Sequence, residues 1–442
     1  MKWLRLSIAD RTSDLPPNVI ERILLFLPVK DAAKAATLST HWRHQWKGIP
    51  QLNFDADFAR VPGVGSYEHN ANRVVLRIYK ALLTHDGPIT RVVLAIPGLR
   101  PIHDIDHLIL HLSKKCVKEF VLRFGDEMDG YPYLNCDVSS SLFAARELVY
   151  LKLQGCTLKA PSWFVGFSNL TRLALNHVYL PSDFFTHFLP KCPLLEQLRL
   201  VHCDQFVNTE ILSPSLKLLS IQSTLYRICF KYAPLLSVVS ILDADEFSDY
   251  RFTLFQQYEL DMVDDVFTSL PALRELTIGT GFLLFLAAGQ VPYKLPTHLH
   301  HLKVLQIYLL LYRWPEARVL VCLIMSSPNL QTLSIQLDTL DYHPTSKLID
   351  SLDKLLKAKD QHGSGCCFQC LEELNIRGSR GMQVELDLVR FVLATAPLLR
   401  KIHIEPRSEL NCDVVLKFLM QLSRYERVSE RAEIIYLWKY EG

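Results

Sequence analysis

Three histidines are the first residues whose spacing could support chemistry. His103, His107 and His111 recur every four residues in the stretch HDIDHLILH, so a helix here would place imidazoles on one face, where two could hold a metal ion. The apolar side chains among them are spaced to form the buried face of the same helix. They are Ile102, Ile105, Leu108, Ile109 and Leu112. The pattern therefore favours an amphipathic helix with its histidines on the polar side, and we expect no metal site.

The cysteines are the second group that could react or bind metal. There are 11, an odd number without a disulfide framework, which indicates reduced thiols in an intracellular protein. The stretch CCFQC contains Cys366, Cys367 and Cys370, one C-x-x-C pair with no second pair at zinc-finger spacing. The sequence has no phosphate-binding or dinucleotide-binding glycine motif and no G-x-S-x-G. We expect no catalytic residues, no cofactor and no covalent chemistry by this chain.

Composition describes a folded chain without a nucleic-acid or membrane signature. Of the 442 residues, 49% are hydrophobic and 21% charged, which allows a large buried core. The net charge is +2 and the basic run KKCVK is short, so we expect no nucleic-acid partner. The start, MKWLRLSIAD, lacks a signal-peptide core, and apolar runs such as GFLLFLAAG fall well below the roughly 20 residues of a membrane span. We expect the nucleus or the cytoplasm, and no membrane partner.

One short phrase returns along most of the chain. It reads Leu-x-x-(Leu/Val/Ile)-x-(Leu/Ile), and a proline often stands two residues before it, as in KCPLLEQLRL and SSPNLQTLSI. Phrases preceded by proline open at Leu195, Leu216, Leu236, Leu273, Leu330 and Leu399; others open at Leu148, Leu170, Leu302 and Leu371, and weaker ones at Ile89 and Val117. Because the alternation has the two-residue period of a strand, each phrase predicts a strand with one buried face.

Each phrase belongs to a larger unit of a strand, a turn and a returning helix. The proline ends the preceding element, and segments between phrases, such as EARVLVCLIMSS, have apolar residues at helical spacing. One unit cannot bury its own leucines, so neighbouring units must stack into an α/β leucine-rich-repeat solenoid. Opening leucines lie 20 residues apart from Leu216 to Leu236 but 41 apart from Leu330 to Leu371, so we expect an irregular solenoid. An ordinary doubly wound α/β domain would not explain such frequent short strands.

The repeats also predict where a partner would bind. In such a solenoid, parallel strands line the concave face and helices the convex face, and the residues between the leucines point to the concave side. Cys156 and Cys203 follow leucine phrases where these repeats often have Asn or Cys, and are expected to be structural. The candidate substrate-binding residues are Tyr150, Lys152, Gln154, Arg172, Asn176, Arg199, Gln222, Gln306, Tyr308, Gln336 and Arg377. The three arginines could meet a phosphate or an acidic segment, although a solvated position is the simpler interpretation for any single residue.

The segment from Asp14 to Trp46, DLPPNVIERILLFLPVKDAAKAATLSTHWRHQW, has a different pattern. It predicts short helices, the first of which ends at Pro28 and carries its apolar residues on one face. These residues are Leu15, Ile20, Ile23, Leu24 and Leu27. So small a segment rarely has a stable core of its own, so we expect a partner to cover it. The alternative is that it only caps the first repeat.

The same segment resembles an F-box. The matching residues are Leu15-Pro16, Ile20, Ile23-Leu24, Leu27-Pro28, Asp31, Ser39, Trp42-Arg43 and Trp46. Its place before leucine-rich repeats is similar to the plant F-box/LRR class, and the ending, CLEELNIRG followed by LVRFVLATAPLLRKIHI, is similar to an FBD region. The resemblance implies an F-box over residues 10–50, a solenoid over 51–365, and FBD-like terminal repeats with a C-terminal cap over 366–442.

The resemblance also implies partners and a function. A Skp adaptor would bind the F-box and connect it to cullin and RING subunits, and the implied adaptor-binding residues are Leu15, Pro16, Ile20, Ile23, Leu24, Leu27, Pro28 and Trp42. The chain would be the non-catalytic substrate-recognition subunit of an SCF-type ubiquitin ligase, its concave face holding a target protein. Two alternatives are a ligase-independent interaction scaffold and a small-molecule sensor of the hormone-receptor type. In the sensor, GFLLFLAAG and YLLLYRW could line a pocket, although buried packing is the simpler interpretation.

Overall fold

The computed structural model describes residues 15–35, 37, 40–59, 71–96, 103–125, 137–203, 209–223, 228–243, 262–309, 314–337, 368–407, 410 and 412–437. The chain divides into two compact units. The first comprises Met1–Leu195 with His202–Asp204, and the second comprises Glu196–Val201 with Gln205–Gly442. Both contain parallel strands and helices, which confirms the α/β repeat fold predicted from the leucine phrases. Among the described residues, no helix has the length and apolar character needed to cross a bilayer.

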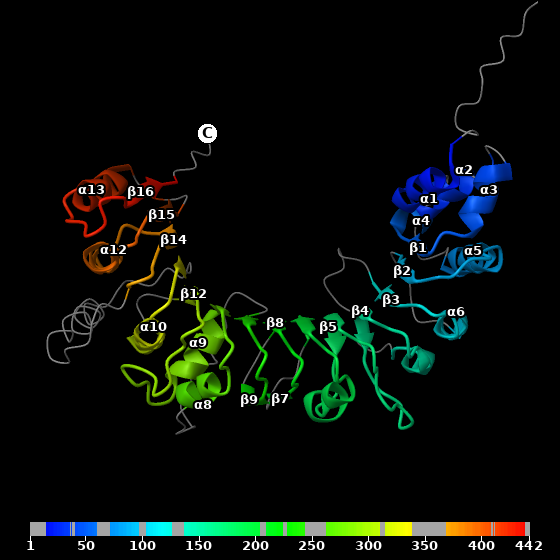
Figure 1. Ribbon diagram of the computed structural model, residues 1–442, viewed down its shortest axis with the longest axis horizontal. Helices are drawn as coiled ribbons and strands as arrows, with labels where there is room; N and C mark the ends of the chain where they lie inside the picture. Colours follow the sequence, from blue (N-terminus) through cyan, green and yellow to red (C-terminus); the bar gives the residue numbers. More distant parts are fainter. Residues whose placement is uncertain are drawn as a thin grey trace, which may run out of the picture. The chain divides into compact units, whose positions relative to one another are not determined.

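The first unit joins a helical hairpin to a parallel sheet. The hairpin consists of α1 (Pro17–Phe26), α2 (Val29–Ala35) and α3 (Thr40–Lys47). The sheet has the order β1 (Gln51–Phe54), β2 (Arg91–Ala95), β3 (Glu119–Arg123), β4 (Tyr150–Thr157) and β5 (Arg172–Tyr179). Its other helical segments are α4 (Ala56–Ala59), α5 (Ala71–Leu83), α6 (His103–Ser113), and short turns at Ser140–Ala144, Phe184–Phe188 and Leu189–Lys191. Helices α5 and α6 lie on one side of β2 and β3 (Figure 1).

The second unit continues the alternation of strands and connecting segments. Its parallel sheet has the order β6 (Gln197–Val201), β8 (Leu218–Gln222), β10 (Val238–Leu242), β11 (Glu275–Ile278), β12 (Val304–Leu309), β13 (Thr332–Leu337), β14 (Glu373–Ser379), β15 (Lys401–Pro406) and β16 (Glu433–Tyr436). Its helices are α8 (Met262–Thr268), α9 (Thr280–Ala287), α10 (Trp314–Ser326), α12 (Gln383–Thr395) and α13 (Cys412–Leu422). Every strand predicted from a leucine phrase in either unit is present.

Buried leucines in register hold each sheet together. Leu151 of β4 lies beside Leu173 of β5, and Leu333 of β13 lies beside Leu374 of β14. All four are at most 1% exposed. Each such side chain contributes roughly 1.5 to 3 kcal/mol when it leaves water. Since a single strand cannot bury this row alone, the register of neighbouring repeats is the source of the stability of the array.

Two connections in the second unit differ from the prediction of a returning helix. After β6 and β8 the chain forms β7 (Thr209–Leu212) and β9 (Ile228–Tyr232), which pair with each other in parallel. They lie opposite β8, as Figure 1 shows. Ile211, Ile228 and Phe230 are buried while their neighbours are more exposed, which is the period of a strand. The expected strand–helix unit is therefore wrong for these two repeats.

The structure describes all of the apolar segment GFLLFLAAG but only part of YLLLYRW. GFLLFLAAG forms most of α9, and its residues from Gly281 to Leu286 are all buried. The helix is apolar on every side, as expected for one enclosed by its neighbours. This insert therefore contributes to the core of the second unit, in line with the packing interpretation. The middle of YLLLYRW, residues 310–313, lies outside the described residues.

A cluster of phenylalanines fills the first unit beneath β4 and β5. Phe164 packs edge-on against Phe143 and Phe167, with ring centroids 5.0 and 4.9 Å apart. Phe188 stacks on Phe164 at 5.4 Å and on Phe184 at 5.1 Å. All five are at most 5% exposed. Because the helical segments here are single short turns, these rings supply much of the apolar area that a full helix would bury.

Left-handed backbone bends occur close to the ends of several strands. Gly125, Gly155, His177 and His202 all have positive φ, of 82°, 71°, 49° and 49°. The imidazoles of His177 and His202 stack with centroids 4.5 Å apart. At Gly155 an added Cβ would collide with the carbonyl oxygen of Phe124. Glycine at this position is therefore required both by the bend and by the approach of the neighbouring repeat.

A buried carboxyl fixes the loop between β14 and α12. Glu385 is 1% exposed, and its carboxyl group accepts hydrogen bonds from the hydroxyl of Ser379 at 2.6 Å and from the backbone N–H groups of Arg380 and Gly381 at 3.0 and 3.1 Å. Burial raises the pKa of Glu385, and these hydrogen bonds oppose the rise only in part. The charged form is therefore less favourable in the folded chain than in the unfolded chain.

This pKa shift predicts that the free energy of unfolding of the wild type, compared with that of a Glu385→Gln variant, changes with pH. Because the folded-state pKa is raised, the contribution of Glu385 to stability should be greatest below its ordinary pKa of 4.5 and should fall as the pH rises towards the folded-state value. The glutamine does not titrate. As the pH rises through this range, the wild type should therefore lose free energy of unfolding relative to the variant. Urea titrations of both proteins across the pH range would measure it, and a constant difference would contradict the prediction.

Candidate functional site

The hairpin presents an apolar stripe to solvent. Val19, Ile23 and Phe26 lie on one face of α1 at four- and three-residue spacing, and are 37%, 37% and 87% exposed. Ile20 and Leu24 occupy another face of α1 and are 0% and 1% exposed. The helix is thus apolar on two sides, and only one of them packs inside the chain.

The apolar face predicted for α1 is buried only in part. Ile20 and Leu24 are buried, and so is Trp42 of α3, because α1 and α3 pack against each other. In the isolated chain these side chains build the hairpin and offer almost no surface to a partner. Pro16 is exposed, whereas Leu15, Leu27 and Pro28 are half-buried. Adaptor binding by these four and by Ile23 stays a prediction. Sequence reasoning missed Val19 and Phe26, although their spacing with Ile23 already marked a second stripe.

The hairpin also covers the beginning of the sheet. Helix α2 contacts β1 and α4, and its Val29 and Ala32 are buried at 4% and 1% exposure. This contact protects the apolar end of the first repeat, as a capping element should. Capping does not use the stripe of Val19, Ile23 and Phe26, which faces solvent.

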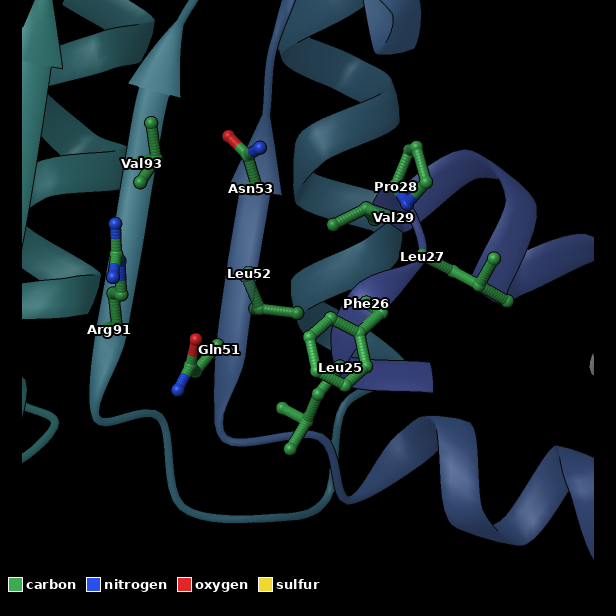
Figure 2. Close-up of a pocket in the computed structure, with 10 residues that line it drawn as sticks. All are labelled: Leu25, Phe26, Leu27, Pro28, Val29, Gln51, Leu52, Asn53, Arg91 and Val93. Atoms are coloured by element: carbon green, nitrogen blue, oxygen red, sulfur yellow. The ribbon is translucent and has the colours of Figure 1, made fainter. Parts of the chain in front are cut away.

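A pocket of about 400 Å³ lies where the hairpin meets β1 and β2. Figure 2 shows the chain around the turn from α1 to α2 on one side and side chains of the two strands on the other. The lining residues are Leu25, Phe26, Leu27, Pro28, Val29, Gln51, Leu52, Asn53, Arg91 and Val93. Apolar side chains come mainly from the turn, and amide and guanidinium groups come from the strands. The pocket therefore suits an apolar group with a polar or anionic neighbour.

The exposed faces of the strands carry a ladder of polar side chains. We call the side chains that alternate with the buried leucines on β1 to β5 the polar face of the first unit. Arg91, Glu119, Tyr150 and Arg172 lie in line across β2 to β5. A nitrogen of Arg172 lies 3.0 Å from the Glu119 carboxylate and one of Arg91 lies 3.5 Å from it, while the Arg172 guanidinium stacks 4.7 Å from the Tyr150 ring centroid. One carboxylate thus serves two guanidinium groups.

The next rows of the polar face add more positive charge. Lys152 of β4 lies in line with Val93 and Val121, and Arg123 donates a hydrogen bond from Nε to Gln154 Oε1 at 3.0 Å. Lys152 makes no ion pair with any described residue. On the described strands of this face, Arg91, Arg123, Lys152 and Arg172 are balanced by Glu119 alone. The face is therefore positively charged.

The corresponding face of the second unit has no such excess. Arg199, Arg377 and Lys401 share it with four carboxylates, from Glu275, Glu373, Glu405 and Glu433. Several of its side chains bond to one another. Gln306 Nε2 donates to Tyr308 Oη at 3.0 Å, and Arg377 Nε lies 3.8 Å from a Glu405 oxygen.

The candidate substrate-binding residues consequently divide between the units. Tyr150, Lys152, Gln154, Arg172 and Asn176 belong to the polar face of the first unit, and Arg199, Gln222, Gln306, Tyr308, Gln336 and Arg377 to that of the second. Arg91 and Arg123 were missed, because Arg91 lies within a weak copy of the repeat and Arg123 directly follows another.

The structure describes part of the groups that were considered for catalysis or metal binding. His107 and His111 are exposed on α6, whose buried side carries Ile105, Leu108, Ile109 and Leu112. No cluster of His, Cys, Asp or Glu in the described part of the chain is placed to hold a metal ion. Cys156 and Cys203 are buried thiols, and burial raises the pKa of the Cys192 thiol to about 12. Cys366 and Cys367 lie outside the described residues.

Comparison with known proteins identifies the two parts of the chain. An F-box domain model matches residues 12–52, and a model described as "FBD-associated F-box protein At5g56370, LRR repeats" matches residues 105–335, more than half of the chain. The hairpin and the strands that follow it are thus those of an F-box protein with leucine-rich repeats. The chain belongs to the family of FBD-associated F-box proteins with leucine-rich repeats.

Relatives from Arabidopsis thaliana match along nearly the full length. The F-box/FBD/LRR-repeat protein At1g13570 is 29% identical, over 97% of this chain and 98% of its own. The putative FBD-associated F-box protein At5g56820 is 28% identical over 88% of this chain and 85% of its own. The FBD-associated F-box protein At5g56370 is 24% identical over 97% of this chain and 100% of its own.

Proposed function

We propose that this chain is the substrate-recognition subunit of an SCF-type cullin-RING ubiquitin ligase. F-box domains generally bind Skp1-like adaptors. The observation that carries the proposal is the stripe of Val19, Ile23 and Phe26, an apolar surface that packing inside the chain leaves uncovered. Exposed apolar stripes of this kind are typical of helices that dock against a partner.

The division of labour between the parts supports the same mechanism. The adaptor would hold the hairpin, and the polar faces of the repeats would hold the target. Fixing a target beside a ubiquitin-charged conjugating enzyme raises the effective concentration of its lysines, so the receptor contributes position and no nucleophile. The family relationship supports a non-catalytic subunit, because members of this family are generally adaptors without catalytic activity.

The test is capture of a Skp adaptor and a cullin by the full chain and by an Ile23→Asp, Phe26→Asp variant. Burying a charge at the centre of an apolar interface should cost at least about 2 to 4 kcal/mol, enough to abolish capture in a pull-down. A Leu76→Asp, Leu83→Asp variant is the matched control, because these leucines of α5 are 59% and 76% exposed in the same unit. The control should capture the adaptor as well as the intact chain does.

Two results would contradict the proposal. If the intact chain captures neither adaptor nor cullin, the alternative of a ligase-independent scaffold is favoured. If both double variants lose capture equally, the stripe on α1 is not the adaptor site. Circular dichroism of all three proteins would establish that the hairpin still folds, since Ile20 and Leu24 remain in place.

A further inference from the structure

We propose that the polar face of the first unit binds an acidic, extended segment of the target protein, with one apolar side chain of that segment held in the pocket beside Val93. This inference rests on the proposed function and specifies the class of target that the receptor would recognise. It is carried by two features of the same unit, the positive charge of the strands and the pocket at their edge.

The positive charge of this face favours an acidic ligand. Four cationic side chains lie on three rows of β2 to β5 with Glu119 as the one carboxylate among the described strand residues of this face. The Arg172 and Arg91 side chains are 43% and 45% exposed, so both can take a second anionic partner while they keep Glu119. Guanidinium groups bind carboxylates and phosphates in a bidentate manner, which fixes the direction of an acidic segment.

The register of the strands sets the spacing in the ligand. Val93 lines the pocket on β2 and is in line with Val121 and then Lys152, two strands further along. Neighbouring strands are about 4.8 Å apart, so Lys152 lies roughly 10 Å from Val93 and Arg172 roughly 14 Å from Arg91. An extended peptide advances about 3.3 Å per residue. Carboxylates about three and four residues from the apolar side chain would therefore reach these cations.

The pocket favours an apolar residue at the end of this row. Leu25 of α1 lines the pocket together with Leu27 and Pro28 of the following turn, while Gln51 and Asn53 of β1 present amides that can bond to the peptide backbone. Figure 2 shows these groups on opposite sides of the pocket. The volume of about 400 Å³ can accept one large side chain and its neighbours.

The experiment measures binding of fluorescent synthetic peptides by the full chain without its adaptor, because Phe26, Leu27 and Pro28 line the pocket and are also proposed or implied adaptor contacts. The probe has one leucine followed by glutamates over about five residues, and a second probe has the reverse order. We expect saturable binding that weakens with added salt and falls at least about tenfold when glutamine replaces glutamate. Peptides with phosphoserine in place of glutamate, and free inorganic phosphate as a competitor, distinguish a phosphorylated target segment from an Asp- or Glu-rich one, and binding of either acidic peptide supports the proposal.

Two double variants locate the site. Lys152→Gln with Arg172→Gln should weaken binding at least about tenfold, whereas Arg199→Gln with Arg377→Gln removes the same charge from the second unit and should leave binding unchanged. In a Val93→Phe variant, which fills the pocket, changing the peptide leucine to serine should no longer matter. No saturable binding of any acidic peptide up to about 1 mM, or equal losses in both double variants, would overturn the inference.

Adaptor capture on the same samples separates this inference from the proposed function. Capture without peptide binding would refute the acidic-segment proposal alone. Peptide binding without capture of the adaptor would refute the ligase role and leave the binding site in place.

Discussion

A Phe167→Ala variant is expected to lose about 3 to 5 kcal/mol of the free energy of unfolding of the first unit. Phe167 is 1% exposed and contacts Phe143, Phe164 and Phe188 with ring centroids 6.1, 4.9 and 6.3 Å away. Its removal leaves a cavity among rings that are held by short helical turns, and the edge-on contact with Phe164 is lost as well. Guanidinium titration followed by far-UV circular dichroism measures the change.

The adjacent Val165 provides the control for this experiment. Its side chain is 84% exposed, so Val165→Ala should change the free energy of unfolding by no more than about 0.5 kcal/mol. If the phenylalanine variant is too unstable to purify, Phe167→Leu should give a smaller, measurable loss in the same direction. Equal stabilities for Phe167→Ala and Val165→Ala would show that the ring cluster does not support the unit.

A Gly155→Ala variant should be destabilised by about 2 to 4 kcal/mol, a large effect for the addition of one methyl group. The residue has φ of 71°, and its new Cβ would meet the carbonyl oxygen of Phe124 from the neighbouring repeat. The loss therefore combines backbone strain with the displacement of β3 from β4. The same denaturant titration, with hydrogen exchange of the β3 and β4 amides, would detect both parts.

Gly48→Ala tests whether this loss comes from the conformation at Gly155. At Gly48 an added Cβ would have only an ordinary contact, 3.6 Å from the carbonyl oxygen of Gln45. The alanine there should be tolerated or slightly stabilising. Similar losses at both glycines would contradict the argument from the left-handed bend.

Much of the fold could be predicted because the leucine phrase encodes a strand within six residues. Strand β1 was missed although Ile49, Leu52 and Phe54 have the spacing of the phrase and are at most 2% exposed, because phenylalanine stands at its last position. Strands β7 and β9 were missed for another reason. Their pairing joins two connecting segments, and single repeats contain no signal for a contact between connections.

The candidate site was predictable only in part. Alternation placed Tyr150 and Lys152 on the exposed side of β4, but the charge of a face depends on which strands adjoin, so the grouping of Arg91, Arg123 and Arg172 emerges only from the register. On α1, a single helical period could not decide which of two apolar stripes packs inside. Contact between α1 and α3 decides it in favour of Ile20 and Leu24.

The contact between α2 and β1 couples the hairpin to the repeat array. By thermodynamic linkage, a ligand that binds only the folded hairpin raises the free energy of unfolding of everything that unfolds with it. An adaptor concentration one hundred times the dissociation constant would raise the free energy of unfolding by about 2.7 kcal/mol. Under the proposed function, chains bound to the adaptor would therefore resist unfolding better than unbound chains.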